Sequence, residues 1–286
     1  MIRKMYLLGL LVLGTLFWII PHKKEKIPFS LSAIHTPLPL HPEWETHPLD
    51  EGQMQEVLEA LRQPYHYLGS GGQCYTFVSL DNRYVIKFIK QRAFALPAWA
   101  RYIPWIAHKK RLKREERRSR VFSAFKLSFE HLARETGLLF VHFNPTHHLQ
   151  TTLSVTAPDN SVHSLDLDAT QFVLQKKAVL ASHYIDALMQ ANQPEAAKRA
   201  INDQLTLMTT LQTQGFYNRD PNFCSNFGFI DERAALIDVG RLVRSEEITQ
   251  RGLLRTTVRF KRYLTKNHPE LLEYFEKEVA KILAPG

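Results

Sequence analysis

Residues 215–226 read Gly-Phe-Tyr-Asn-Arg-Asp-Pro-Asn-Phe-Cys-Ser-Asn, and this stretch decides how the rest of the chain is interpreted. It follows a long helical pattern and precedes a short apolar run. A second loop, Leu-Ile-Asp-Val-Gly at 236–240, ends the next apolar run. Carboxylate and amide oxygens are hard ligands that suit Mg²⁺. The two loops therefore predict one metal site that includes Asp220, Asn226 and Asp238.

Two further features lie upstream, in a strand-like part of the chain. The glycines at 69, 71 and 72 open a hairpin, and glycine lets backbone N–H groups approach phosphate oxygens closely. The plain alternative is an ordinary turn. Lys87 stands between apolar residues in the next strand, and a lysine is almost never buried without an anionic partner. The alternative for Lys87 is an exposed position on an edge strand.

In order and spacing, these features resemble the protein-kinase-like fold from about Tyr65 to Arg244. The resemblance implies a nucleotide site between two lobes, with ATP and Mg²⁺ as cofactors. Gly69, Gly71 and Gly72 would cover the phosphates, and Lys87 would contact the α- and β-phosphates. Gln175, Lys176 and Lys177 would belong to the hinge, whose backbone would face adenine.

The same resemblance implies catalytic roles in the second half of the chain. Asp220 would occupy the position of the catalytic acid, with Arg219 before it, and Asp238 and Asn226 would hold Mg²⁺. A helix carboxylate would pair with the strand lysine. Glu130 is the first choice for it and Glu116 the alternate, and for either the alternative is a solvated helix charge.

Several positions depart from the family pattern. Cys74 replaces the third glycine, Asn218 the catalytic-loop histidine, and Val239 the phenylalanine of the acidic triplet. Ser225 stands where the metal-binding asparagine is expected, one residue before Asn226. These departures keep a second hypothesis open, a pseudokinase that binds nucleotide or serves as a scaffold without transfer.

The chain also has little length beyond the second loop. Only 46 residues follow Gly240, which leaves little room for a full peptide-binding lobe. The resemblance is therefore to compact, atypical kinases. Lipopolysaccharide-core sugar kinases share the Arg219-Asp220 pair and the Ile237-Asp238 pair followed by an arginine, here Arg241. The implied reaction is transfer of the ATP γ-phosphate to a hydroxyl of an unidentified acceptor.

Composition restricts the alternatives. The chain has 286 residues, of which 44% are hydrophobic and 23% charged, as in a globular protein. Its two cysteines exclude a disulfide scaffold and a four-cysteine zinc site. A net charge of +9 indicates an anionic partner.

The elements predicted from hydrophobic periodicity are strand-rich first and helical later. Strands at 75–80 and 83–89 flank an Asp-Asn turn, and a long basic helix covers 108–136. Helices are predicted at 178–190, 195–214 and, in two segments, 246–283. The fold class is thus α+β, with residues 53–177 as the N-lobe, including a basic helical insert, and 178–286 as the C-lobe.

The N-terminal part indicates membrane attachment. Arg3 and Lys4 precede an apolar run at 5–20, which favours an uncleaved signal anchor over 1–27, a single transmembrane helix. A cleaved signal peptide and a peripheral helix are the alternatives. Prolines at 28–52 predict an extended tether. ATP chemistry favours a cytoplasmic globular domain.

The basic run at 109–120 is the second candidate for membrane contact. It follows aromatic residues that include Trp99 and Trp105, and such a combination suits an anionic lipid surface. The alternatives are a solvated helix face and a nucleic-acid surface. The sequence contains no recognised nucleic-acid module, so no specific nucleic acid is expected.

Overall fold

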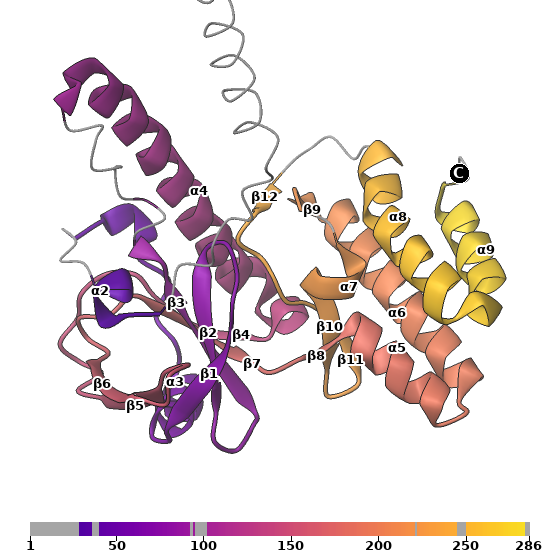
Figure 1. Cartoon of the computed structure of the whole chain (residues 1–286), viewed down its shortest axis with the longest axis horizontal. Coiled ribbons are helices and arrows are strands. Elements are labelled where there is room, and N and C mark those ends of the chain that lie inside the picture. The colour runs from indigo at the N-terminus through magenta and orange to yellow at the C-terminus, as the bar shows by residue number, and fades with distance from the viewer. Residues whose placement is uncertain are drawn as a thin grey trace, which may run out of the picture.

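The computed structural model describes residues 29–35, 40–91, 94, 102–220, 222–244 and 250–283, except the side chains of 250–255. The described chain has a strand-rich lobe and a helical lobe joined by the segment between β7 and β8 (Figure 1). This is the α+β arrangement that the sequence predicts.

The first lobe holds a curled sheet with helices packed around it. Its elements are α2 (Leu31–Ile34), η1 (Pro42–Trp44), α3 (Glu51–Leu61), β1 (Tyr65–Ser70), β2 (Cys74–Ser79), β3 (Tyr84–Ile89), α4 (Pro104–Thr136), β4 (Leu138–His142), β5 (Thr152–Thr156), β6 (Val162–Asp166) and β7 (Phe172–Lys176).

The second lobe is mainly helical and carries short strands near the lobe junction. Its elements are β8 (Val179–Leu180), α5 (Ala181–Gln190), α6 (Pro194–Thr213), β9 (Phe216–Asn218), α7 (Phe223–Asn226), β10 (Phe227–Ile230), β11 (Arg233–Leu236), β12 (Leu242–Arg244), α8 (Gln250–Asn267), η4 (Pro269–Leu271) and α9 (Leu272–Leu283).

The sheet of the first lobe has the strand order β4-β7-β3-β2-β1-β5-β6. Neighbouring strands are antiparallel except β1 and β5, which are parallel. The β2–β3 hairpin turns where the sequence predicts it, and Asn82 there adopts the left-handed conformation that asparagine tolerates. This hairpin fixes the register that orients Lys87.

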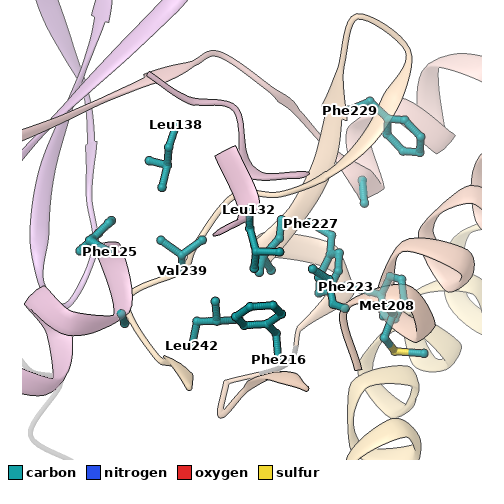
Figure 2. Packing of buried hydrophobic residues seen from close by; sticks show 14 of the residues in the cluster. Phe125, Leu132, Leu138, Met208, Phe216, Phe223, Phe227, Phe229, Val239 and Leu242 are labelled. Atoms are coloured by element: carbon teal, nitrogen blue, oxygen red, sulfur yellow. The ribbon is translucent and has the colours of Figure 1, made fainter. Parts of the chain in front are cut away.

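The two faces of the sheet enter different hydrophobic cores. Successive side chains of a strand point to opposite faces, so Phe77 and Phe88 lie on one face and Lys87 on the other. The first face is buried with α2, α3 and β5–β6. The second faces α4 and the helical lobe, whose apolar residues form one continuous core with it (Figure 2). Both lobes thus depend on the interface that contains Lys87.

Helix α4 bridges the lobes. Proline occupies its first turn, and Gly137 ends it in the left-handed conformation with φ 66°. The helix contacts β4 in its own lobe and β11 and β12 in the other. Its C-terminal half is buried at Phe122, Phe125 and Phe129, whereas its N-terminal half projects away from the body of the lobe (Figure 1).

The predicted tether is wrong for the residues that the structure describes. Ala33 and Ile34 of α2 are buried, and Trp44 is buried against the ring of Phe122 at a centroid distance of 4.5 Å. Phe29 packs edge-on against Phe77. These apolar anchors outweigh the extended preference of the prolines, so the first lobe begins before residue 53.

In the part of the chain that the structure describes, no helix has both the length and the apolar character needed to cross a bilayer. The anchor predicted at 1–27 lies outside the described residues, as does Trp99.

Candidate active site

A cleft of about 640 Å³ lies at the junction of the lobes. Its volume falls in the range of small-molecule sites. Of the residues predicted to act on nucleotide or metal, five line this cleft together: Gly71, Gly72, Lys87, Asp220 and Asp238.

Lys87 enters the cleft because the strand register turns its side chain away from the apolar face. Its Nζ atom donates to the backbone carbonyl of Ile237 at 2.9 Å. Burial lowers the pKa of Lys87, and the nearby Asp238 opposes this effect. Lys87 therefore links the small-lobe sheet to the loop that carries Asp238.

Glu130 is not the partner of Lys87, which corrects the prediction from the sequence. Its Oε1 atom lies 3.8 Å from Lys126 Nζ and 4.0 Å from His47 Nδ1. At 100° per residue, Glu130 lies roughly 140° around α4 from Phe125, which lines the cleft.

The alternate carboxylate, Glu116, is exposed on the projecting half of α4. The helix presents Arg117 and Phe125 to the cleft instead. The cleft-facing side of α4 is thus basic and apolar where a carboxylate was expected.

The glycine-rich turn is open above the cleft. A Cβ atom at Gly69, Gly71 or Gly72 would meet no heavy atom within 4 Å beyond its neighbours, so the backbone there is accessible. Lys90 holds the turn through bonds to Ser70 Oγ at 2.5 Å and Gly71 O at 2.6 Å. Gly71 and Gly72 line the cleft, whereas Gly69 does not.

Cys74, at the third glycine position, is buried, and burial raises its pKa to about 12. It therefore remains a thiol.

Asn218 ties the two loops of the large lobe together. Its Nδ2 atom donates to Asp238 O at 2.9 Å, and its Oδ1 atom accepts from Asp220 N at 3.0 Å. Asn218 therefore orients the backbone of both acidic residues.

Asn226 lies behind the cleft and does not line it. The side chain is buried, its Nδ2 donates to Asp220 O at 2.5 Å, and its Oδ1 accepts from Ser225 Oγ at 2.9 Å. Ser225, five residues after Asp220, lines the cleft. Asn226 thus positions Asp220, which differs from the direct metal ligand that was predicted.

The oxygen donors at the cleft fit a divalent cation. Asp238 is exposed there, and Ser225 and Asp220 line the same cleft. These are hard oxygen donors of the kind that Mg²⁺ takes, together with water and phosphate oxygens. Among the described residues, the cleft included, no group of three histidine, cysteine or acidic side chains is placed to hold a metal, so phosphate oxygens and water would have to complete the coordination.

Of the three predicted hinge residues, Lys177 lines the cleft, whereas Gln175 and Lys176 do not. Gln175 is fully buried and donates to Thr136 O at 2.6 Å, and Lys176 pairs with Glu56 at 3.2 Å on α3. The backbone N–H of Lys176 is bonded to Gly137 O. The linker lines the cleft from Lys177, the last predicted hinge residue, to Leu180.

Asp220 stands at the mouth of the cleft beside two arginines. Arg241 Nη1 lies 3.6 Å from Asp220 Oδ2, and Arg219 N donates to Arg241 O at 3.1 Å. The side chain of Asp220 is 44% exposed. The carboxylate is therefore accessible to an incoming hydroxyl.

Val239 and Gly240 connect Asp238 to the rest of the protein. Val239 is fully buried in the core that also holds Phe125, Leu132 and Leu138 (Figure 2). Gln73 Nε2 donates to Gly240 O at 3.5 Å, so the turn above the cleft touches the loop that carries Asp238. Val239 thus anchors the loop that carries Asp238 in the core, although valine is smaller than the phenylalanine that the sequence resemblance predicts at this position.

Three solved structures illustrate what the chain is similar to. The crystal structure of WbdD, described as a bifunctional kinase-methyltransferase, matches 78% of this chain and 47% of its own, with 16% identity and a TM-score of 0.42. The ROP18 kinase domain in complex with AMP-PNP and sucrose matches 72% and 64%, with 14% identity and a TM-score of 0.35. The gentamicin–APH(2″)-IIa complex matches 84% and 98%, with 12% identity and a TM-score of 0.31.

These likenesses concern the fold alone, and the chain spans less than half of the WbdD chains. No protein-family model and no curated protein sequence matches the chain. The kinase-like fold predicted from the sequence is recognised in the chain's own geometry. Strand lysine, glycine turn and two acidic loops converge on one inter-lobe cleft.

Proposed function

We propose that the protein is a phosphotransferase that uses ATP and Mg²⁺. The observation that carries the proposal is the convergence of Lys87, Asp220 and Asp238 on one cleft beneath a glycine-rich turn. A cation, an accessible backbone and two carboxylates are the groups that phosphoryl transfer requires, because this reaction depends on positioning and charge neutralisation.

Each residue has a distinct role in this proposal. Lys87 binds phosphate oxygens, and the backbone at Gly71 and Gly72 covers them. Asp238 would hold Mg²⁺ with Ser225 nearby, and the ion would neutralise phosphate charge when bound. Asn218 and Asn226 keep the two acidic loops in register.

Asp220 would act on the acceptor. It orients the acceptor hydroxyl and takes its proton as the hydroxyl oxygen forms a bond to the γ-phosphorus. The bond from that phosphorus to the β,γ-bridging oxygen breaks, and ADP leaves with the electron pair. The products are a phosphate monoester and ADP, and the proton passes from Asp220 to solvent.

A pseudokinase is the second candidate. It is favoured by one specific observation, the absence of a carboxylate from α4 at Lys87, since Glu130 pairs with Lys126. The test is ADP release from MgATP in the presence of acceptor extracts, alongside nucleotide binding. Binding with turnover supports the transferase, and binding without turnover across all fractions supports the pseudokinase.

We also propose that residues 1–27 anchor the protein in a membrane, with the globular domain on the cytoplasmic side, where ATP is present. The projecting half of α4 supports an additional surface contact. Trp105 and Leu112 are exposed there, and Lys109, Arg111 and Lys113 accompany them. Exposed aromatic side chains beside basic ones suit the headgroup region of an anionic leaflet.

A further inference from the structure

A second cavity, of about 250 Å³, lies beside the cleft, and its charged side chains are all arginines. They are Arg117, Arg120, Arg219 and Arg241. Arginine presents a planar fork of donors that matches phosphate and carboxylate oxygens in pairs, so such a lining is typical of an oxyanion site.

The fold brings these arginines together from three separate elements. Arg117 and Arg120 are three residues apart on α4, so they lie on the same side of that helix. Arg219 follows β9 and Arg241 precedes β12, and the pairing of Leu242 with Asn218 places them side by side. The cavity therefore depends on the docking of α4 against the large lobe.

The positive charge of this cavity is poorly balanced within the protein. Arg241 has Asp220 at 3.6 Å. Among the residues that the structure describes, no carboxylate lies within ion-pair distance of Arg117, Arg120 or Arg219. Like charges held close together repel each other, and a bound anion removes that cost.

The location of the cavity indicates which bound molecule would carry the anionic group. Arg117, Arg241 and Gln73 line both the cavity and the cleft. Arg241 also contacts Asp220, the residue assigned to the acceptor hydroxyl. A molecule whose hydroxyl reaches Asp220 can therefore place an oxyanion among the arginines. Lys87 and the glycine turn are assigned to the nucleotide phosphates.

We infer that the acceptor is itself acidic, an alcohol or sugar that carries a phosphate or carboxylate group close to the hydroxyl that is phosphorylated. This inference rests on the proposed function, because it takes Asp220 as the acceptor residue. The four-arginine cavity selects such acceptors over neutral ones.

The test is the binding of inorganic phosphate and of glucuronate to the full-length protein, by calorimetry and thermal shift. Both measurements are made with and without saturating AMP-PNP and Mg²⁺. We expect phosphate to bind in both conditions. Arg120→Gln should weaken it at least fivefold, and Arg117→Gln combined with Arg120→Gln at least tenfold. If the cavity also accepts carboxylates, glucuronate binding should depend on Arg117 and Arg120 in the same way. If phosphate binds and glucuronate does not, the acceptor is restricted to phosphorylated compounds.

Two variants serve as controls. Arg134→Gln removes an exposed charge from the same helix outside the cavity and should change phosphate affinity less than twofold. Arg120→Lys retains the charge but loses the fork, so its affinity should fall between those of the wild type and Arg120→Gln.

Failure of the inference and failure of the proposed function give different results. If AMP-PNP binds but phosphate does not bind, or if Arg120→Gln leaves phosphate affinity unchanged, the acidic-acceptor inference is wrong and the phosphotransferase proposal is unaffected. If AMP-PNP displaces phosphate, the arginines serve the nucleotide and the inference is equally wrong. If AMP-PNP does not bind at all while phosphate binding depends on Arg117 and Arg120, the proposed function fails and only the anion site remains.

Discussion

Lys87 and Ile237 are 150 positions apart in the sequence, yet the amine of one donates to the backbone carbonyl of the other at 2.9 Å. This bond joins the small-lobe sheet to the loop that carries Asp238. The lysine has no carboxylate partner from α4, because Glu130 faces Lys126 and His47. The charge of Lys87 is therefore balanced incompletely in the free protein and is available for phosphate.

We predict that Lys87→Met makes the free protein more stable while it weakens nucleotide binding. A hydrogen bond to a charged group contributes about 1.5–3 kcal/mol, so ATP affinity should fall roughly 10- to 100-fold. Stability should rise because burial disfavours the charged amine and lowers its pKa. Urea unfolding and nucleotide titration measure the two effects.

The stability difference between Lys87→Met and wild type should depend on pH with a definite sign. Between the lowered folded pKa of Lys87 and about 10.4, the value for free lysine, the unfolded state binds more protons, so wild-type stability rises with pH. The advantage of Lys87→Met should be largest near neutral pH and shrink toward pH 10. A pH-independent difference between Lys87→Met and wild type would contradict the account.

Gly137→Ala should destabilise the protein by at least about 2 kcal/mol. The left-handed backbone at φ 66° costs about 1–2 kcal/mol for a residue with a Cβ atom, and that atom would lie 2.4 Å from Ile230 Cδ1. Gly52→Ala is the matched control, because the added Cβ atom makes only an ordinary van der Waals contact in α3. This variant should stabilise the protein by about 0.5 kcal/mol. Equal denaturation midpoints for the two variants would refute this.

Asp186 should make the large lobe sensitive to acid. Its Oδ1 atom accepts from Tyr263 at 2.5 Å and contacts His268 Nε2 at 2.7 Å, which ties α5 to the C-terminal helices. Burial raises the pKa of Asp186, but the hydrogen bonds from Tyr263 and His268, together with the charges of His268 and His183, hold the pKa below its ordinary value.

The stability that Asp186 contributes is present above about pH 3.9, the unfolded pKa, and is lost as pH falls through the folded one. Asp186→Asn should therefore be less stable than wild type by about 1 kcal/mol at pH 5, with a difference that shrinks at lower pH. Thermal unfolding from pH 5 to pH 2.5 measures this, with the exposed Asp203→Asn as control. A difference that grows on acidification would show that the sign is wrong.

Residues 29–286 alone should bind anionic vesicles through the projecting half of α4. Replacing Lys109, Arg111 and Lys113 with glutamine should weaken binding about 100-fold, since each basic residue contributes about 1 kcal/mol near an anionic surface. Added salt should weaken wild-type binding. Arg117 and Arg118 are left in place, because Arg117 lines the cleft and Arg118 covers the ring of Phe94.

Co-sedimentation with vesicles that contain phosphatidylserine measures this binding. Replacing Arg259, Arg262 and Lys266 on α8 removes equal charge elsewhere and should have a small effect. If both triple variants lose binding equally, the interaction reflects net charge and α4 has no special role.

The order of the chemical groups along the chain was sufficient to predict the cleft. Lys87, Asp220 and Asp238 each lie in or beside a short strand, and local patterns define such strands well. The predicted pairing of Glu130 with Lys87 is wrong. Glu130 was selected by its distance from the end of α4, and that distance does not specify which side of the helix it occupies. The apolar residues Phe122, Phe125 and Phe129 define the buried side of that helix, and they place Glu130 away from it.

The remaining errors concern contacts that local patterns do not encode. Gln175 is polar and yet fully buried, since it satisfies the carbonyl of Thr136 across 39 positions. The arginine cavity requires α4, β9 and β12 to meet, which only the tertiary fold establishes. The tether was predicted from the prolines at 28–52. The apolar residues Ile34 and Trp44 in the same stretch indicate packing instead, and both are buried.

The most direct test of the account is calorimetric titration of ATP into the full-length protein, with and without Mg²⁺. We predict saturable binding at one site that Mg²⁺ strengthens at least tenfold. That enhancement should be lost in Asp238→Asn and retained in Asp231→Asn, which alters an exposed acid in the β10–β11 turn. Folded wild-type protein that shows no saturable binding of MgATP at millimolar concentration would contradict the central claim.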